Sequence, residues 1–215
     1  MKNQLLIIGA SGHGKVVADI ALKLNKWKQI FFLDDDDSIV EAMGIKVIGK
    51  TADAFLHIED SDIFVAVGDN TTRKVTQEKL ESLGANIPVL IHPNAVIGDD
   101  VSIKEGTVIM AGVVINCCSN IGKGCIINTS STVDHDNEIS DFVHISPGAH
   151  LSGSVSIGEN SWIGTGCDII NNISITDQCI IGAGSVVIKD IKEPGTYVGI
   201  PVRRLENEKD INTSK

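Results

Sequence analysis

An aliphatic residue recurs at every sixth position through the second half of the chain, without a break from Ile91 to Ile181. A spacing of six drifts around an α-helix, whereas residues two apart on a strand face the same side. A small residue often lies two positions before the aliphatic one, as Ser131 does before Val133, and Gly, Asn or Asp are common in the corner that follows. The repeat predicts a left-handed parallel β-helix of roughly five three-sided coils, stacked at about 4.8 Å.

The N-terminal part of the chain follows a different pattern. Apolar runs at residues 4–8, 30–33 and 63–67 predict strands, and helical periodicity follows the first and the third. Alternating strands and helices are typical of a parallel α/β sheet. The predicted units are a small Rossmann-like domain over 1–88, the β-helix over 89–205 and a polar, flexible tail over 206–215.

Composition narrows the classes of partner. The formal net charge of -10 argues against a nucleic-acid backbone, although backbone amides can still hold a nucleotide. No apolar run is long enough to cross a bilayer. The five cysteines show no metal-like spacing, which suits a reducing compartment. We therefore expect a cytoplasmic protein that does not span a membrane, holds no metal and binds no nucleic acid.

A glycine-rich turn at Gly9–Gly14 joins the first predicted strand to a helix, a place where backbone amides attract phosphate. Asp34 and Asp35 end the second predicted strand, where carboxylates contact ribose or base in such folds. The domain is too short for a full dinucleotide fold, so a nucleotide sugar or mononucleotide is favoured over an NAD-type ligand. A turn used only for tight packing is the alternative.

Histidines in the repeat suggest chemistry. His135 occupies a corner between two aspartates and projects outward, while His144 and His150 precede inward aliphatic residues and face outward from strands of the same coil. The eighteen-residue coil stacks Gly153 over His135, which leaves room for a ligand beside a possible general base. Acyl transfer needs such a base and a donor to the developing oxyanion. Any one of these histidines can also be a solvent-exposed residue without a function.

Two further features follow from the period. The corner residues Pro147, Thr165 and Ala183 form one vertical column, and a groove along it suits an elongated cofactor. Three cysteines fall at inward small positions, where a thiol simply packs; they are Cys125, Cys167 and Cys179. No cysteine is placed as a covalent carrier, so direct attack of the acceptor on a thioester is preferred.

Short motifs spread from Leu5 to Leu205 carry a family resemblance. They are Gly9-Ala10-Ser11-Gly12-His13-Gly14, Phe32-Leu33-Asp34-Asp35, Val67-Gly68-Asp69-Asn70 with Arg73, Ile127-Asn128-Thr129-Ser130-Ser131, His135 with its acidic neighbour, His144-Ile145-Ser146-Pro147-Gly148-Ala149 and Gly199-Ile200-Pro201. Together they resemble the bacterial hexapeptide-repeat sugar acetyltransferases of the PglD/NeuD type.

The resemblance implies a homotrimer with active sites between adjacent prisms and acetyl-CoA lying along the β-helix. His135 would be the catalytic base and Asp136 its modulator, where close relatives carry Glu. The nucleotide-linked sugar would be held by Ser11, Gly12, His13, Asp34, Asp35 and Gly68. Acetyl-CoA would be contacted by His144, Gly153, Thr165 and Ala183.

The expected function is N-acetylation of the 4-amino group of a UDP-linked amino-deoxysugar for surface glycan or glycoprotein synthesis. O-acetylation of sialic acid, or N-acetylation of a GDP- or dTDP-linked amino sugar, keeps the same chemistry with another acceptor. A non-catalytic β-helix binding protein is a different class that the sequence leaves open.

Overall fold

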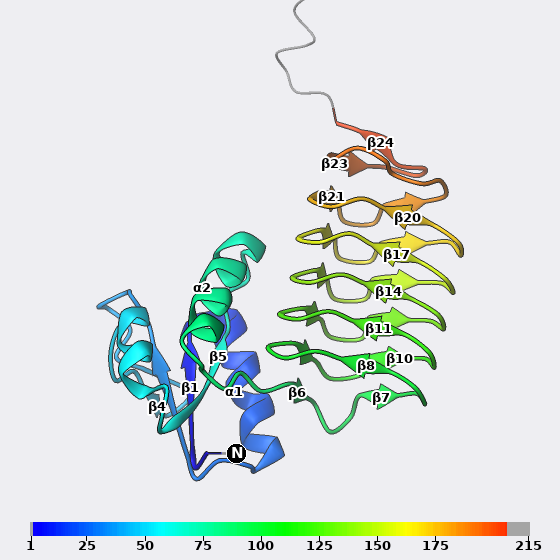
Figure 1. The fold of residues 1–215 in the computed structure, drawn as a ribbon. Coiled ribbons are helices and arrows are strands. Elements are labelled where there is room, and N and C mark those ends of the chain that lie inside the picture. Colours follow the sequence, from blue (N-terminus) through cyan, green and yellow to red (C-terminus); the bar gives the residue numbers. More distant parts are fainter. Residues whose placement is uncertain (1, 206–215) are drawn as a thin grey trace, which may run out of the picture.

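The computed structural model describes residues 2–205, which form a small α/β unit beside a tall three-sided prism (Figure 1). The predicted tail at 206–215 lies outside the described residues. The prism is the predicted left-handed parallel β-helix, and the α/β unit is the predicted Rossmann-like sheet, so the fold class is confirmed.

The N-terminal sheet has three parallel strands in the order β2-β1-β5. Its elements are β1 (Gln4–Ile8), α1 (Gly12–Leu24), β2 (Gln29–Leu33), β3 (Glu41–Ala42), β4 (Ile45–Lys46), the 3-10 helix η1 (Thr51–His57), β5 (Ser61–Val65) and α2 (Asn70–Ser82). The third strand was predicted at 63–67 and begins earlier because polar Asp62 is buried, with its carboxylate accepting from Trp27 Nε1 at 2.8 Å and Asn86 Nδ2 at 2.6 Å.

The prism has three faces built from very short strands. Face 1 consists of β6 (Leu90–Ile91), β9 (Val108–Ile109), β12 (Ile126–Ile127), β15 (His144–Ile145), β18 (Trp162–Ile163), β21 (Cys179–Ile181), β23 (Gly195–Val198) and the antiparallel β24 (Arg203–Arg204). Face 2 consists of β7 (Val96–Ile97), β10 (Val114–Ile115), β13 (Thr132–Val133), β16 (His150–Leu151), β19 (Asp168–Ile169) and β22 (Val186–Val187). Face 3 consists of β8 (Ser102–Ile103), β11 (Asn120–Ile121), β14 (Glu138–Ile139), β17 (Ser156–Ile157) and β20 (Ser174–Ile175).

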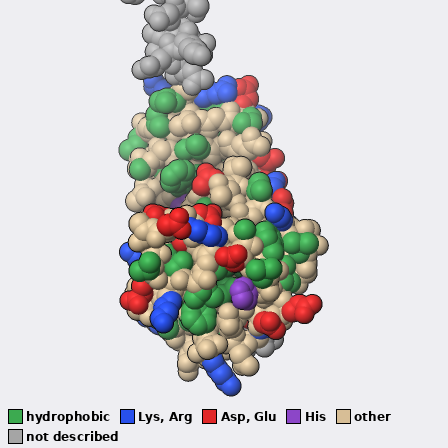
Figure 2. Space-filling model, turned by 90° about the vertical axis from the view of Figure 1, so that its left-hand side faces the viewer, with side chains coloured by type: hydrophobic (Ala, Val, Ile, Leu, Met, Phe, Trp, Pro, Cys, Tyr) green, Lys and Arg blue, Asp and Glu red, His purple; other side chains and the backbone are tan. Residues whose placement is uncertain are grey.

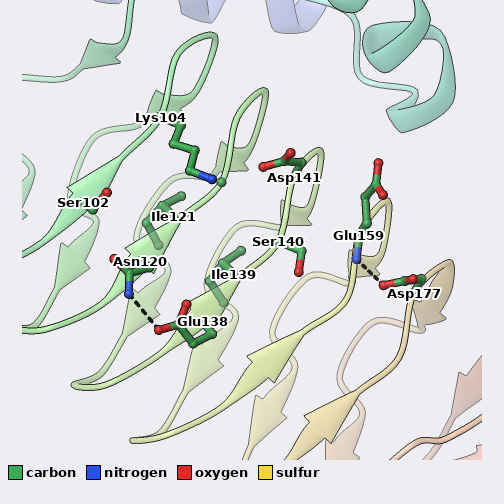
Figure 3. A pocket seen from close by; sticks show the side chains of 11 residues that line it. Ser102, Lys104, Asn120, Ile121, Glu138, Ile139, Ser140, Asp141, Glu159 and Asp177 are labelled. Carbon is green, nitrogen blue, oxygen red and sulfur yellow. Dashed lines mark hydrogen bonds between the residues drawn. The ribbon is translucent and has the colours of Figure 1, made fainter.

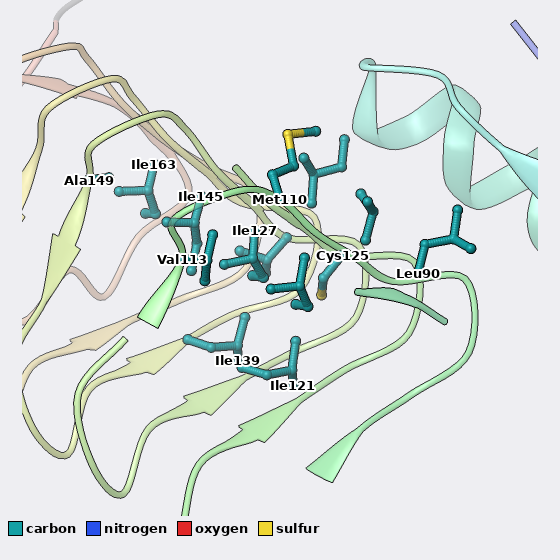
Figure 4. Packing of buried hydrophobic residues seen from close by; sticks show 14 of the residues in the cluster. Leu90, Met110, Val113, Ile121, Cys125, Ile127, Ile139, Ile145, Ala149 and Ile163 are labelled. Carbon is teal, nitrogen blue, oxygen red and sulfur yellow. The ribbon is translucent and has the colours of Figure 1, made fainter. Parts of the chain in front are cut away.

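Each coil stacks on the next with the register that the period predicts. Val133 pairs with Leu151, eighteen residues later, and the aliphatic side chains of Ile127, Ile139 and Ile145 fill the interior (Figure 4). The aliphatic series continues one hexad beyond Ile181, since Val187 is also fully buried. The interior of the prism is therefore a packed hydrophobic core.

Three edges join the faces. The small-residue edge, between faces 1 and 2, carries residues 147–148, 165–166 and 183–184. The histidine edge, between faces 2 and 3, carries 134–136 and 152–154, and the docking edge, between faces 3 and 1, carries 140–142, 158–160 and 176–178.

The N-terminal unit packs on face 1 and the docking edge. Val17 and Ile20 of α1 share a buried cluster with Leu90 and Val108 of face 1. Residues of α2 reach the docking edge, where Lys74 pairs with Glu159. Because the histidine edge joins the two remaining faces, it lies on the side of the prism away from the N-terminal unit.

Candidate active site

The histidine edge presents an exposed imidazole with an acidic partner. His135 Nδ1 lies 2.7 Å from Asp136 Oδ2, and the two side chains are 53% and 59% exposed. The hydrogen bond to Asp136 raises the pKa of His135, and the charges of Asp134 and Asp136 add to this. With a proton on Nδ1 donated to Asp136, Nε2 keeps its lone pair and can accept a proton.

The backbone that carries His135 is fixed from inside the prism by Asn137. This side chain occupies an inward position, is fully buried, and donates from Nδ2 to the carbonyl oxygens of Asp134 at 2.6 Å and Ser152 at 3.0 Å. Its Oδ1 accepts from the Val155 amide at 3.1 Å. Asn137 stands two positions before Ile139, where the repeat usually carries a small residue, and its hydrogen bonds tie the corner that carries His135 to the coil above.

Gly153 lies directly over His135, as the eighteen-residue coil predicts. A Cβ at this position would come within 2.5 Å of His135 Cε1 and 2.6 Å of Nε2. The glycine is therefore required by the close approach of the imidazole.

His144 occupies a different environment on face 1. Its ring stacks on Trp162, with centroids 5.7 Å apart and planes 4° from parallel, and Asn128 Nδ2 lies 3.1 Å from its Nε2. Burial, together with the charges of Arg73 and His13, lowers the pKa of His144 to about 3. His144 is therefore a neutral imidazole under the N-terminal unit.

The three histidines of this coil do not meet within a single chain. His135 lies on the histidine edge and His144 on face 1, while His150 is exposed on face 2, where its Nδ1 lies 2.9 Å from Thr132 Oγ1. Residues of one coil point away from a prism in three directions, so closeness in sequence does not bring them together.

The predicted acetyl-CoA residues are also divided among these surfaces. The column of Pro147, Thr165 and Ala183 exists on the small-residue edge, where Gly166 N donates to Pro147 O at 3.1 Å and Gly184 N to Thr165 O at 2.8 Å. Gly153 lies on the histidine edge and His144 on face 1. Within one chain, the column does not share a groove with Gly153.

A cavity of about 320 Å³ lies at the carboxyl ends of the N-terminal strands. It is lined by four of the predicted nucleotide-sugar residues, Ser11, Asp34, Asp35 and Gly68. Both oxygens of Asp34 already accept backbone amides, Oδ2 from Ala10 at 2.7 Å and Oδ1 from Asp36 at 2.9 Å. Asp34 thus holds the glycine-rich turn in shape beside the cavity.

The other two predicted nucleotide-sugar residues do not line this cavity. Gly12 begins α1, and its Cβ direction is open. His13 is buried near Arg73, and burial, with the charge of Arg73, lowers its pKa to about 4. Its Nε2 is buried without a hydrogen-bond partner among the described residues.

Arg73 joins the two units, a role that its place in a motif did not reveal. Its guanidinium is buried and donates to the carbonyl oxygens of Gly68 at 3.1 Å, Gly124 at 2.7 Å and Phe142 at 3.1 Å. Further bonds reach Val67 O at 3.0 Å and Asn70 Oδ1 at 2.7 Å. All five N–H donors are used, which fixes the rim of the 320 Å³ cavity relative to the docking edge.

The cysteines are placed as the period predicts. Cys125, Cys167 and Cys179 are buried inside the prism, and burial raises the pKa of the Cys125 thiol to about 12. Cys117 and Cys118 are exposed, and all five cysteines are free. Within residues 2–205, no cluster of His, Cys, Asp and Glu is arranged to hold a metal ion, and no helix is long and apolar enough to cross a membrane.

A shallow hollow of about 580 Å³ on face 3 contains none of the predicted site residues. Its polar groups bond within the prism: Asn120 Nδ2 donates to Glu138 Oε1 at 2.7 Å and Glu159 N to Asp177 Oδ1 at 2.7 Å (Figure 3). These hydrogen bonds join one coil to the next, so we interpret the polar groups of this hollow as stabilising the prism.

The fold and the histidine edge place the chain in the class of hexapeptide-repeat acyltransferases. The family described as PglD N-terminal domain matches residues 4–80, and the one described as bacterial transferase hexapeptide (six repeats) matches 154–189. The acetyltransferase domain of PglB from Neisseria gonorrhoeae, also solved with acetyl coenzyme A, is 42% identical with a TM-score of 0.92 over 95% of this chain and 100% of that chain.

Two further proteins are similar. A histidine mutant of the Caulobacter crescentus perosamine N-acetyltransferase, solved with CoA and GDP-perosamine, is 33% identical with a TM-score of 0.90 over 95% of this chain and 97% of that chain. The UDP-N-acetylbacillosamine N-acetyltransferase of Bacillus subtilis is 39% identical over 114 residues, 52% of each chain.

This chain therefore belongs to the PglD-type family of hexapeptide-repeat sugar acetyltransferases. It is an acetyl-CoA-dependent sugar N-acetyltransferase.

Proposed function

We propose that the enzyme transfers acetyl from acetyl-CoA to the 4-amino group of a UDP-linked amino-deoxysugar that serves surface glycan or glycoprotein synthesis. The observation that carries the chemistry is the exposed His135 imidazole, with Nδ1 bonded to Asp136 at 2.7 Å. The Bacillus subtilis relative, named for a UDP-linked sugar, supports the UDP acceptor.

In the proposed reaction, the amine nitrogen attacks the thioester carbonyl carbon while His135 Nε2 takes its proton. The tetrahedral intermediate collapses with cleavage of the C–S bond, and the imidazolium returns the proton to the leaving thiolate. Asp136 orients the ring and stabilises the imidazolium. The thiols of Cys125, Cys167 and Cys179 are buried inside the prism and cannot carry the acetyl group. Their burial supports direct attack of the amine on the thioester.

The site proposed here is shared between two chains of a homotrimer. His135 projects from the edge remote from the N-terminal unit, so it faces away from the nucleotide cavity of its own chain. A neighbouring prism can bring its histidine edge to that cavity. Acetyl-CoA then lies between prisms, in contact with His144, Thr165 and Ala183 of one chain and with Gly153 beside His135 of the next.

We assign nucleotide-sugar binding to residues 1–88 and acetyl transfer to residues 89–205. The cavity supports Ser11, Asp34, Asp35 and Gly68 as sugar-nucleotide ligands, and the glycine-rich turn supports Gly12 and His13 beside them. A cytoplasmic location agrees with five free thiols and with acetyl-CoA as donor.

The test measures release of the CoA thiol with UDP-, GDP- and dTDP-linked amino sugars. The His135→Ala variant is expected to lose about 10²- to 10⁴-fold in kcat. His57→Ala, which removes an imidazole from η1 outside the nucleotide cavity, serves as the control. A wild-type rate for His135→Ala would contradict the catalytic assignment.

A GDP-linked acceptor is the second candidate, favoured by the Caulobacter crescentus relative solved with GDP-perosamine. Faster turnover of GDP-linked than UDP-linked amino sugars would replace the first proposal. Turnover of free sialic acid would instead indicate O-acetylation.

A further inference from the structure

A second hollow, of about 440 Å³, lies between the start of α2 and the upper part of face 1. Gly68 and Asn70 border it from the N-terminal unit, and Asn160, Trp162, Gln178 and Ile180 border it from the prism. None of the prism residues in this hollow was predicted to contact a ligand. We name it the Trp162 hollow.

The floor of the Trp162 hollow is apolar and open. Trp162 and Ile180 are paired on neighbouring strands of face 1 and remain 47% and 44% exposed. Figure 2 shows apolar side chains on the part of the prism that rises above the N-terminal unit. An exposed indole offers a flat surface for the C–H groups of a sugar ring.

The indole is held in place before any ligand arrives. Trp162 Nε1 donates to Ser146 Oγ at 2.7 Å, and the ring stacks on His144. These contacts lock the side-chain orientation, so binding against the indole costs little conformational entropy.

Polar groups form the rim. Asp69 caps α2 by accepting from the Thr72 amide at 2.8 Å, and this hydrogen bond keeps the pKa of Asp69 low, so its carboxylate is ionised. Gln178 also lines the hollow and carries an amide that can donate and accept hydrogen bonds. An apolar floor with acceptors and donors at its rim matches a ring that carries hydroxyl and amine groups.

The Trp162 hollow and the nucleotide cavity share Gly68, and a Cβ there would meet nothing within 4 Å. Their spacing is fixed, because Arg73 binds Gly68 O while Asn70 Nδ2 donates to Asn160 O at 3.3 Å and Ser161 O at 3.2 Å. Two adjoining hollows of different chemistry fit a ligand with two unlike parts.

We propose that the Trp162 hollow holds the sugar ring of the nucleotide-linked acceptor, and that Trp162, Gln178 and Ile180 determine which amino sugar is accepted. The proposal rests on the proposed function, because the nucleotide must occupy the neighbouring cavity. It also places the acceptor amine on face 1, where only the His135 of another chain can reach it.

The test compares Trp162→Ala with wild type in the intact enzyme. KM for the nucleotide-linked amino sugar is expected to rise about tenfold or more. The dissociation constant of UDP alone, measured by calorimetry, is expected to stay within about twofold, because Trp162 does not line the nucleotide cavity. KM for acetyl-CoA is compared in Gln178→Ala, since Trp162 stacks on His144, which is proposed to contact acetyl-CoA. Leu56→Ala, which truncates an exposed apolar side chain in η1, is the matched control.

Two further variants keep the test informative if Trp162→Ala folds poorly. Trp162→Phe retains an aromatic floor and should recover most of the affinity, while Gln178→Ala should change the ranking of amino sugars in the panel. A rise in KM for acetyl-CoA alone would indicate that the hollow binds acetyl-CoA and would overturn the proposal. Unchanged constants would overturn it too. Absence of wild-type turnover with every nucleotide-linked amino sugar would instead defeat the proposed function.

Discussion

Replacing Gly153 by alanine puts a methyl group where the His135 imidazole now lies. The added Cβ would be 2.5 Å from Cε1 and 2.6 Å from Nε2. Carbon atoms in contact are normally about 3.5–4.0 Å apart, so the ring must move by roughly 1 Å or more. A displacement of that size at a catalytic group costs about 10²-fold in rate, which is the expected loss in kcat.

The fold should tolerate this change. His135 is half exposed and can swing into solvent, so the melting temperature is expected to fall by less than about 2 °C. Kinetics would be read from CoA thiol release at saturating substrates, with Ser156→Ala, at an exposed position of β17, as the control. Wild-type kcat in Gly153→Ala, with the protein folded, would refute the requirement for this imidazole orientation.

Three more predictions follow from the site. Asp136→Asn removes the partner that raises the pKa of His135. The base is lost as pH falls through that pKa, so the acid limb of the kcat/KM profile should move to lower pH. The value of kcat at the optimum should fall by about tenfold. Arg73→Ala leaves buried carbonyl groups without donors and should lower the free energy of unfolding by about 3 kcal/mol or more in denaturant titrations. The control is Lys74→Ala, which breaks a surface ion pair at the same junction and should lower the free energy of unfolding by less than about 1 kcal/mol. Cys117→Ala should keep kcat within about twofold if attack is direct, and trapping of an acetyl-cysteine by mass spectrometry would contradict that mechanism.

The period of the sequence was sufficient for everything that depends on the coil itself. Inward burial of Cys125 and the stacking of Gly153 over His135 follow from a fixed eighteen-residue register, because each strand pairs with its equivalent one coil away. The alternation of strand and helix likewise predicts the N-terminal sheet, since local hydrophobic patterns decide those elements.

What the sequence left unpredicted depends on how the two units dock. The covering of His144, the five bonds of Arg73 and the hollow at Trp162 arise where α1 and α2 meet the prism. These contacts join residues far apart in the chain, and no periodicity encodes them. Asn137 is an intermediate case, because its position broke the small-residue pattern while its hydrogen bonds required coordinates.

The central claim is that one active site takes His135 from one chain and the nucleotide cavity from another. Two inactive variants test it: His135→Ala, and Gly68→Trp, whose side chain enters open space at the junction of the two hollows. In randomly mixed trimers each interface pairs an intact histidine edge with an intact cavity in about a quarter of cases, so about a quarter of wild-type activity should return. Mixed trimers that remain as inactive as either parent would show that each chain works alone and would contradict the shared site.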